Sequence, residues 1–422
     1  MMKIKLLVTI LLSFFVHRSF SAPPSASLWR PMEGGLAYLL SSQVRIRLFT
    51  EFNPDYAIFT VNSGQYRISN GTGGSITMPQ GGQVIIGRHN NKIFVKKKNE
   101  VSFTGDSVDL KGLTGDDYFS LRIYKTGRLN RNYSGDLKCF SDMETLFLIN
   151  TCDIEKYVAG VVKAEGGSGQ NEEYFRTQAV IARTYTYKYF NKHINNRYNL
   201  CDDTHCQAFN GLSEDSLIIN AVSHTNGLVI TTPDNVLISS AFHSNCGGET
   251  SPSEYAWVTG QTYLTRVIDP YCQNSRNALW ERKLSLKEWT DFLKKNGYAG
   301  IQSDPSVFNF NQTSRVPDYV AGLFSIPLRT IRTGLNLRSS YFSVSVEGDS
   351  LLLKGRGYGH GVGLCQEGAM AMAMKGFTYQ QIINFYYFGV LIIDINNAVL
   401  LTPNPPTPHL GGYEGRTLTW GL

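Results

Sequence analysis

Glycine occupies every second position of the segment Gly355-Arg356-Gly357-Tyr358-Gly359-His360-Gly361-Val362-Gly363. This spacing leaves one side of an extended segment without side chains, so a polymer or another stretch of backbone can lie against it. No frame fits G-x-G-x-x-G and no G-K-[ST] follows, so a nucleotide-binding loop is not expected. Arg356 and His360 are candidate substrate-binding residues; a histidine hydrogen-bonded within a turn is the alternative for His360.

The rest of the sequence predicts a mixed fold with a large core. The chain has 422 residues, 42% hydrophobic and 18% charged, which suits two or three domains or one large domain with insertions. Residues 44–125 alternate between apolar and polar types, and turn pairs such as Asn70-Gly71 and Gly81-Gly82 interrupt them. We predict an α+β protein with a smaller β-rich N-terminal region (residues 23–126), a mixed α/β core (127–392) and a Pro/Gly-rich tail (393–422).

The N-terminus predicts export. Lys3 and Lys5 precede an apolar run that is too short to span a bilayer, and small residues follow it. Residues 1–22 therefore resemble a secretory signal peptide, with an uncleaved anchor as the alternative. We expect a soluble protein of the periplasm or cell envelope that is not integral to a membrane once processed. The net charge of +6 is modest, and the one dense basic block, Lys96-Lys97-Lys98, is typical of a solvated strand end, so nucleic acid is not expected as a partner.

Glu165 stands at the end of a predicted helix. Asp153 is suited to cap this helix, and Gly166, Gly167 and Gly169 are suited to end it. Partial burial and the negative end of the helix dipole would both raise the pKa of a carboxyl group here, toward the range useful for a general acid. The alternative is a solvated glutamate at a helix end.

A second helix is predicted from Asn171 to about Asn191. Its apolar stripe leaves Gln178 and Arg183 on another face, where they could point at a cleft.

Cysteine and histidine cluster between residues 201 and 206. Cys201, His205 and Cys206 have a spacing that allows all three to bind one zinc ion, with His193 or His243 as the fourth ligand. A disulfide between Cys201 and Cys206 is the alternative for an exported protein. The chain has seven cysteines, so at least one is not paired within it.

The segment His243-Ser244-Asn245-Cys246 offers a serine or a cysteine nucleophile beside a histidine. Its spacing alone is weak support, because neighbouring residues of a strand point to different faces. Neither a G-x-S-x-G elbow nor an H-E-x-x-H motif occurs in the sequence.

Taken in order, these segments resemble the stage II sporulation protein D family. The motifs that carry the resemblance are 157–165 (YVAGVVKAE), 178–185 (QAVIARTY), 243–250 (HSNCGGET) and 357–369 (GYGHGVGLCQEGA). The resemblance covers about residues 130–390. It implies a lytic transglycosylase that cleaves peptidoglycan glycan strands stripped of stem peptides and leaves 1,6-anhydromuramic acid ends.

The resemblance also implies roles for particular residues. The catalytic glutamate falls on Glu165, Arg183 lines the cleft, and Gln366 lies in the closing motif as a substrate-binding candidate with Gln178 and Ser244. Some members hold a zinc at a segment like residues 201–206, where it would be structural and not required for the chemistry.

One carboxylate would suffice for such a reaction, because the hydroxyl of the sugar itself attacks the anomeric carbon. A hydrolase would need a partner, for which Glu254 and Asp269 are candidates. Two other functions stay open: a non-catalytic, glycan-binding activator of a cell-wall amidase, and a cysteine- or metal-dependent peptidase.

Overall fold

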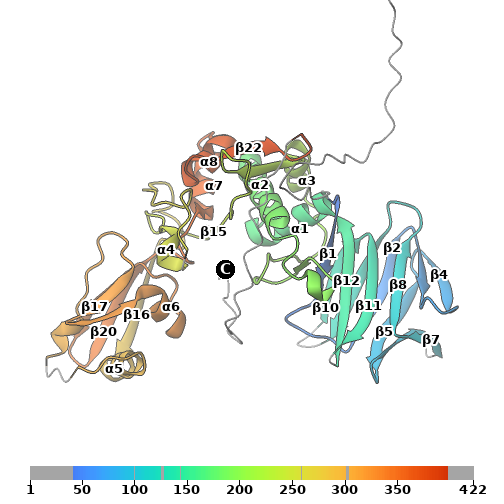
Figure 1. The fold of residues 1–422 in the computed structure, drawn as a ribbon, viewed down its shortest axis with the longest axis horizontal. Helices are drawn as coiled ribbons and strands as arrows, with labels where there is room; N and C mark the ends of the chain where they lie inside the picture. Colours follow the sequence, from blue (N-terminus) through green and yellow to red (C-terminus); the bar gives the residue numbers. More distant parts are fainter. Residues whose placement is uncertain are drawn as a thin grey trace, which may run out of the picture. The chain divides into compact units, whose positions relative to one another are not determined.

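The computed structural model describes residues 41–397, apart from residues 99, 125–127, 143, 258 and 301–303. The predicted signal peptide, residues 1–22, lies outside the described residues, as does the predicted tail beyond residue 397. Within the described part of the chain the fold is mixed, with several β-sheets and eight α-helices (Figure 1). The prediction of a mixed α and β protein is therefore confirmed.

Two large, mainly antiparallel sheets form a β-sandwich. In spatial order, the seven-stranded sheet contains β13 (Leu200–Cys201), β1 (Gln43–Arg47), β12 (Thr145–Asp153), β11 (Asp136–Asp142), β8 (Ser107–Gly112), β3 (Gln65–Ser69) and β4 (Ser75–Pro79). The six-stranded sheet contains β10 (Arg128–Ser134), β9 (Tyr118–Tyr124), β2 (Tyr56–Ser63), β5 (Gln83–His89), β6 (Lys92–Lys97) and β7 (Glu100–Gly105).

Alternating side chains explain how the two sheets pack. In β1, Val44 and Ile46 are fully buried while Arg45 and Arg47 lie partly exposed on the other face. Between the sheets, the ring of Phe59 in β2 lies 5.2 Å from that of Tyr66 in β3. Burial of such rings removes large apolar areas from water and is the main source of sandwich stability.

The sheets continue past residue 126. Strand β10 pairs with β9 along its whole length, and β11 pairs with β8. Strand β12 pairs with β1 from Gln43↔Asp153 to Arg47↔Ile149. Asp153, the last residue of β12, directly precedes the first helix. The sandwich thereby fixes where that helix begins.

Eight α-helices lie in the described residues. They are α1 (Ile154–Gly166), α2 (Glu172–Lys188), α3 (Ser216–His224), α4 (Ser253–Ala256), α5 (Leu286–Lys295), α6 (Leu328–Gly334), α7 (Gln366–Met374) and α8 (Tyr379–Tyr386), with short 3-10 turns at Ile194–Asn196 and Pro305–Phe308. Helices α1, α2 and α3 pack on one another (Figure 1). A capping box formed by Thr378 and Gln381 starts α8.

Smaller sheets complete the fold. They are β14 (Leu228–Thr231) with β22 (Leu391–Asp394), β15 (Phe242–His243) with β21 (Leu364–Cys365), β16 (Leu279–Ser285) with β20 (Ser350–Arg356) and β19 (Phe342–Glu347), and β17 (Asp318–Ala321) with β18 (Phe324–Pro327). Residues of β16–β20, α5 and α6 enclose a second hydrophobic cluster centred on Trp289 and Tyr319, whose rings lie 5.3 Å apart.

The glycine segment packs against another part of the backbone. Its neighbour is the stretch around His243: β15 pairs with β21 in parallel, and Asn245 bridges to Tyr358. A Cβ on Gly359 would lie 2.8 Å from the Cβ of His243, and a Cβ on Gly361 would lie 2.7 Å from the Arg315 guanidinium. The alternating glycines were expected to leave room for either a polymer or another stretch of backbone. In the structure, this room is filled by backbone and side chains of the same chain.

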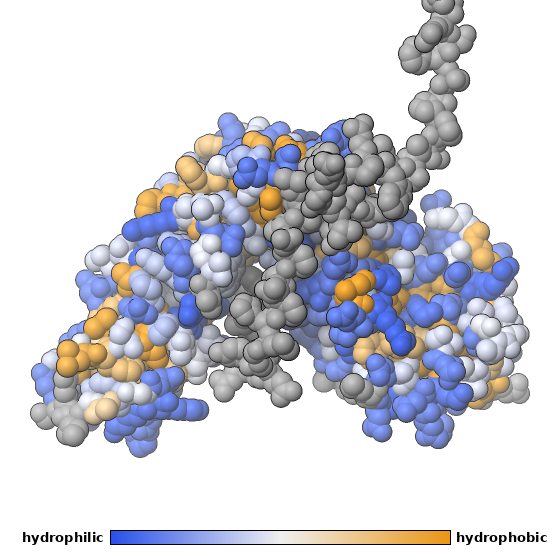
Figure 2. Space-filling view, in the orientation of Figure 1, coloured by the Kyte–Doolittle hydropathy of each residue, from blue (hydrophilic) through white to orange (hydrophobic). Residues whose placement is uncertain are grey.

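The visible surface is mainly hydrophilic. Figure 2 shows hydrophobic residues as separate patches between hydrophilic ones, which is ordinary for a globular protein. No helix within the described residues is both long enough and apolar enough to cross a membrane.

Candidate functional site

The position of Glu165 follows from the two ends of α1. The carboxylate of Asp153 accepts hydrogen bonds from the backbone N–H groups of residues 155 and 156 and so starts the helix. The helix ends at Gly166, and Gly167 follows with φ +75°, a conformation that glycine adopts at little cost. The predicted start and stop of this helix are confirmed, and they leave Glu165 in its last turn.

The Glu165 side chain is half-buried and lines a cavity of about 360 Å³. Its Oε1 accepts a hydrogen bond of 2.7 Å from the backbone N–H of Ala208. Burial raises the pKa of the Glu165 carboxyl above its usual range, and the Ala208 N–H opposes part of that rise. The carboxyl thus keeps its proton to a higher pH than an exposed glutamate.

Aromatic and polar residues share the remaining wall of the cavity. Tyr185 comes from α2, Tyr189 directly follows that helix, Phe242 comes from β15, and Trp257 from the turn after α4. Several hydroxyl, amide and imidazole groups lie between these rings, a mixture typical of small-molecule sites. Among the described residues that line this cavity, Glu165 is the only carboxylic acid.

Two histidines border the cavity in neutral form. His243 Nδ1 donates to the carbonyl of Val362 (3.1 Å), and His360 Nδ1 accepts from the backbone N–H of the same residue (3.0 Å). Burial and the positive charges of Arg332 and Arg315 lower the pKa of His360 to about 3, and burial lowers the pKa of His243 well below its usual value. At neutral pH both rings can exchange hydrogen bonds with a ligand without adding charge.

Ser244 and Gln366 also line the cavity. Gln366 opens α7, and its side-chain amide donates to the backbone carbonyl of Glu165 (3.0 Å). The glycine segment leads directly into α7, so it carries this amide to the end of α1. Four of the residues singled out from the sequence, namely Glu165, Ser244, His360 and Gln366, are thus brought together.

Three other candidates lie away from the cavity wall. The Arg183 side chain is fully buried; its Nε lies 2.7 Å from Glu155 Oε1, and its Nη1 donates to the Leu228 carbonyl (3.0 Å). Gln178 is 2% exposed in the interior of α2. Arg356 packs on the ring of Tyr341 at 4.7 Å. These contacts are those of structural residues, and roles in substrate binding stay predictions for all three.

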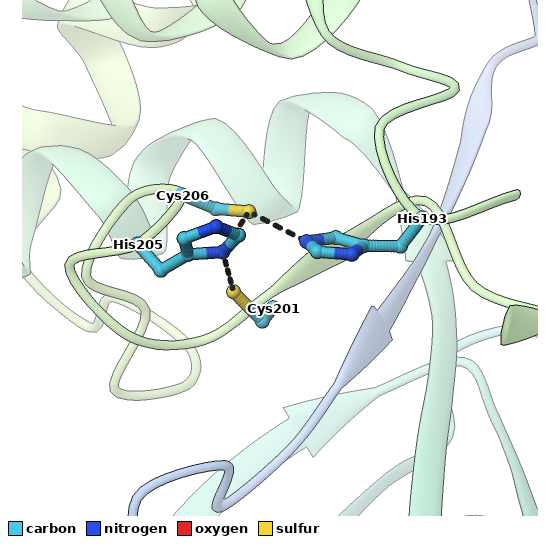
Figure 3. A group of neighbouring side chains, drawn as sticks. All are labelled: His193, Cys201, His205 and Cys206. Carbon is cyan, nitrogen blue, oxygen red and sulfur yellow. Dashed lines mark hydrogen bonds between the residues drawn. The ribbon is translucent and has the colours of Figure 1, made fainter. Parts of the chain in front are cut away.

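His193, Cys201, His205 and Cys206 form a group with the geometry of a metal site (Figure 3). Cys206 Sγ lies 3.4 Å from His193 Nε2 and 3.9 Å from His205 Nδ1, and Cys201 Sγ lies 3.5 Å from His205 Nδ1. Ligands of a tetrahedral zinc, at 2.0–2.3 Å from the ion, lie about 3.3–3.8 Å apart, so this Cys₂His₂ set fits zinc. Of the two candidates for a fourth ligand, His193 belongs to the group and His243 does not.

The Cys₂His₂ group lies next to the cavity. Cys206 contributes to the cavity wall, and Ala208, two residues later, donates to Glu165. All seven cysteines, each within the described residues, carry free thiols, so the structure contains no disulfide between Cys201 and Cys206. An ion bound here would hold the loop that orients the carboxyl group.

Known proteins are similar to more than half of this chain. A family described as Stage II sporulation protein matches residues 142–232. Stage II sporulation protein D of Bacillus amyloliquefaciens is 30% identical over 268 residues, which are 59% of this chain and 76% of that protein. The chain belongs to the stage II sporulation protein D family. The family resemblance of the motifs is therefore confirmed.

Two further relatives differ in how much of them is matched. An uncharacterized protein of Brachyspira hyodysenteriae is 28% identical over 319 residues, covering 73% of this chain and 80% of that protein. A Bacillus subtilis protein named amidase enhancer is 26% identical over 286 residues, but these are only 40% of its length.

Within this family member, the match to residues 142–232 includes Glu165, Ala208 and the Cys₂His₂ group but not His243, His360 or Gln366. Sequence reasoning missed the Ala208 N–H, because a backbone donor leaves no mark in residue type. It also assigned no site role to Tyr185, Tyr189 or Trp257, because their aromatic character is common to many core positions. Cys246, considered as a nucleophile, is fully buried and does not line the cavity.

Proposed function

We propose that this protein is an exported lytic transglycosylase that cleaves the glycan strands of peptidoglycan, with Glu165 as its general acid and base. Denuded strands, which have lost their stem peptides, are the proposed substrate, and 1,6-anhydro-N-acetylmuramic acid ends are the proposed product. Family membership and the surroundings of Glu165 support this proposal.

One observation carries the proposal: a half-buried carboxyl group with a raised pKa is the only acid among the described residues of the cavity wall. Hydrolysing glycosidases place two carboxyl groups about 5–10 Å apart, one on each side of the bond. The two residues considered as partners lie elsewhere: Asp269 is fully buried outside the cavity wall, and Glu254 is exposed on α4. A single acid suits a reaction in which the sugar supplies its own nucleophile.

The proposed reaction uses one carboxyl group twice, first as an acid and then as a base. Neutral Glu165 protonates the glycosidic oxygen as the C–O bond breaks, and the resulting carboxylate then accepts the proton of the 6-hydroxyl group as its oxygen bonds to the anomeric carbon. The hydroxyl group belongs to the same sugar ring, so proximity lowers the barrier without an enzymic nucleophile. The Ala208 N–H stabilises the carboxylate between these two steps.

The aromatic wall suits a carbohydrate ligand. Tyr185, Tyr189 and Trp257 offer apolar faces on which sugar rings can pack, while Ser244 and the neutral His360 offer hydrogen bonds. The Cys₂His₂ group would hold a structural zinc, which would fix the loop of Ala208 without taking part in the chemistry.

The test is digestion of denuded peptidoglycan by the wild-type protein and by Glu165→Gln, with products examined by mass spectrometry. Glutamine keeps an oxygen for the Ala208 N–H but cannot transfer the proton, so we expect at least about a 100-fold loss of rate with the fold retained. Glu254→Gln is the matched control, because this glutamate is exposed and outside the cavity wall; its activity should be unchanged. Reducing ends in place of anhydro ends would identify a hydrolase and contradict the proposal.

A second candidate function has an observation of its own, namely the similarity to a protein named amidase enhancer. In that case the cavity would bind glycan, and the protein would stimulate a cell-wall amidase without cleaving the strand. Addition of Glu165→Gln to an amidase assay separates the two functions: full stimulation by this variant, together with no anhydro products from the wild type, would favour the activator.

A further inference from the structure

A second group of metal-type ligands lies outside the cavity wall. The ligand atoms of Cys246, Asp269, Cys272 and Cys365 all lie within 4.8 Å of one another, and all four residues are fully buried. They come from three separate segments: the motif after β15, the loop before β16, and the end of β21. No residue is shared with the Cys₂His₂ group, and the proposed reaction uses none of the four.

The distances in this group suit a shared ion better than a disulfide. Cys246 Sγ lies 3.3 Å from Cys272 Sγ and 3.2 Å from Asp269 Oδ2. Sulfur and oxygen ligands of a tetrahedral zinc lie about 3.4–3.8 Å apart, so both distances are slightly shorter than those between zinc ligands, whereas a disulfide requires about 2.05 Å between its sulfurs. A Cys246–Cys272 disulfide would also leave the Cys365 thiol and the Asp269 carboxyl group buried beside it.

Cys365 and Asp269 accept hydrogen bonds from neighbouring groups, as metal ligands commonly do. Cys365 Sγ accepts hydrogen bonds from the backbone N–H groups of Cys246 (3.3 Å) and Gly368 (3.4 Å), and it caps α7. Asp269 accepts from the Tyr386 hydroxyl (2.9 Å) and from the backbone N–H of Tyr271 (2.8 Å). Such outer contacts orient ligands and stabilise their charged forms.

Burial of an ionised carboxylate beside three sulfurs costs free energy unless a positive charge compensates it. Arg315 donates from Nη2 to the carbonyl of Cys246 (2.8 Å) and from Nε to the carbonyl of Glu249 (2.7 Å), so neither of these guanidinium hydrogen bonds reaches the Asp269 carboxylate or a sulfur. We propose that Cys246, Asp269, Cys272 and Cys365 bind one zinc ion in a second, structural site.

This site would position one wall of the cavity. Cys246 is two residues from Ser244, and Cys365 directly precedes Gln366, whose amide holds the carbonyl of Glu165. An ion that joins these two segments to the loop of Asp269 would fix the spacing between Ser244 and α7. The four residues are therefore positioning residues.

The experiment measures zinc per chain in the purified full-length protein, prepared without chelator and without reductant. Cys365→Ser is the decisive variant, because serine can still cap α7 but binds zinc poorly. We expect this variant to hold one zinc fewer per chain than the wild type, while Cys201→Ser loses a different equivalent and the double variant loses both. Asp269→Asn repeats the test with a change that keeps the hydrogen bond from Tyr271.

The outcomes do not depend on enzymatic activity, so this proposal and the proposed function can fail separately. Equal zinc in the wild type, Cys365→Ser and Asp269→Asn would overturn the second site. So would mass spectrometry of the alkylated, non-reduced protein if it found Cys246 and Cys272 joined in a disulfide. Recovery of all three thiols as alkylated cysteines after zinc removal is the result expected from the metal site.

Discussion

Replacement of Arg183 distinguishes a structural role from a role in substrate binding. The guanidinium is fully buried, its Nη2 lies 2.5 Å from Glu155 Oε2, and it donates to the carbonyls of Leu228 and Val222. In Arg183→Met the apolar stem is largely retained, but these hydrogen bonds are lost and Glu155 is left without its partner. The family resemblance instead implies that this arginine lines the cleft.

The expected cost follows from these contacts. Removal of one partner of a buried ion pair costs about 3–5 kcal/mol. The Glu155 side chain is 24% exposed, so water relieves part of its charge, and we take the lower end, about 3 kcal/mol. At about 2 °C per kcal/mol for a large chain, the melting temperature should fall by roughly 6 °C.

Thermal melts followed by circular dichroism measure this change, and digestion of denuded glycan measures activity below the melting temperature. The double variant Arg183→Met/Glu155→Gln is the control, because it removes the unpaired charge and should recover part of the loss. A melting temperature equal to that of the wild type, with activity reduced more than about tenfold, would refute the structural role.

The other predictions concern the cavity. Because the pKa of Glu165 is raised, its neutral form persists to a higher pH than that of an exposed glutamate. The rate of glycan cleavage should therefore fall as pH rises through that raised pKa. The free energy of unfolding should fall over the same pH range, because the folded state binds this proton more tightly than the unfolded state does. Gln366→Ala should lower the rate about 10- to 100-fold through misplacement of Glu165 while costing only about 1 kcal/mol of stability, as a rate assay and a melt would check. Gly359→Ala, at φ +108° and 2.8 Å from His243 Cβ, should destabilise by about 1–3 kcal/mol; Gly348→Ala, at φ +60° with nothing within 4 Å, should cost less, and equal melting temperatures would contradict this reasoning.

Local signals in the sequence were sufficient for much of the fold. Asp153 starts α1 by accepting hydrogen bonds from the first backbone N–H groups, and Gly167 follows its end in a conformation that glycine adopts easily. Both effects are local, so the bounds of α1 could be predicted from neighbouring residues alone. The alternation of Val44 and Ile46 with arginines likewise predicted a half-buried strand. By contrast, nothing near residue 126 indicates that β11 joins the sheet of the preceding strands, because two other strands separate it from its partner β8 along the chain.

The site was predictable to a similar degree. The four ligands of the Cys₂His₂ group lie within fourteen positions of one another, so their spacing was informative, although only the structure selects His193 over His243. The environment of Arg183 was not predictable, because its partner Glu155 is 28 positions away and looks like an ordinary first-turn residue. The second cysteine group was missed for the same reason: its members are separated by up to 119 positions.

The hydrogen bond from Gln366 to Glu165 has a consequence for assembly, because it joins residues 201 positions apart. As the chain is made or threaded from its N-terminus, Glu165 emerges long before the helix whose glutamine donates to its carbonyl. A fragment ending before residue 364 would keep the whole segment matched by the family, residues 142–232, yet it would lack the strand that delivers Gln366. Such a fragment should be inert until the missing piece is supplied, which makes the chain a natural candidate for split-protein complementation.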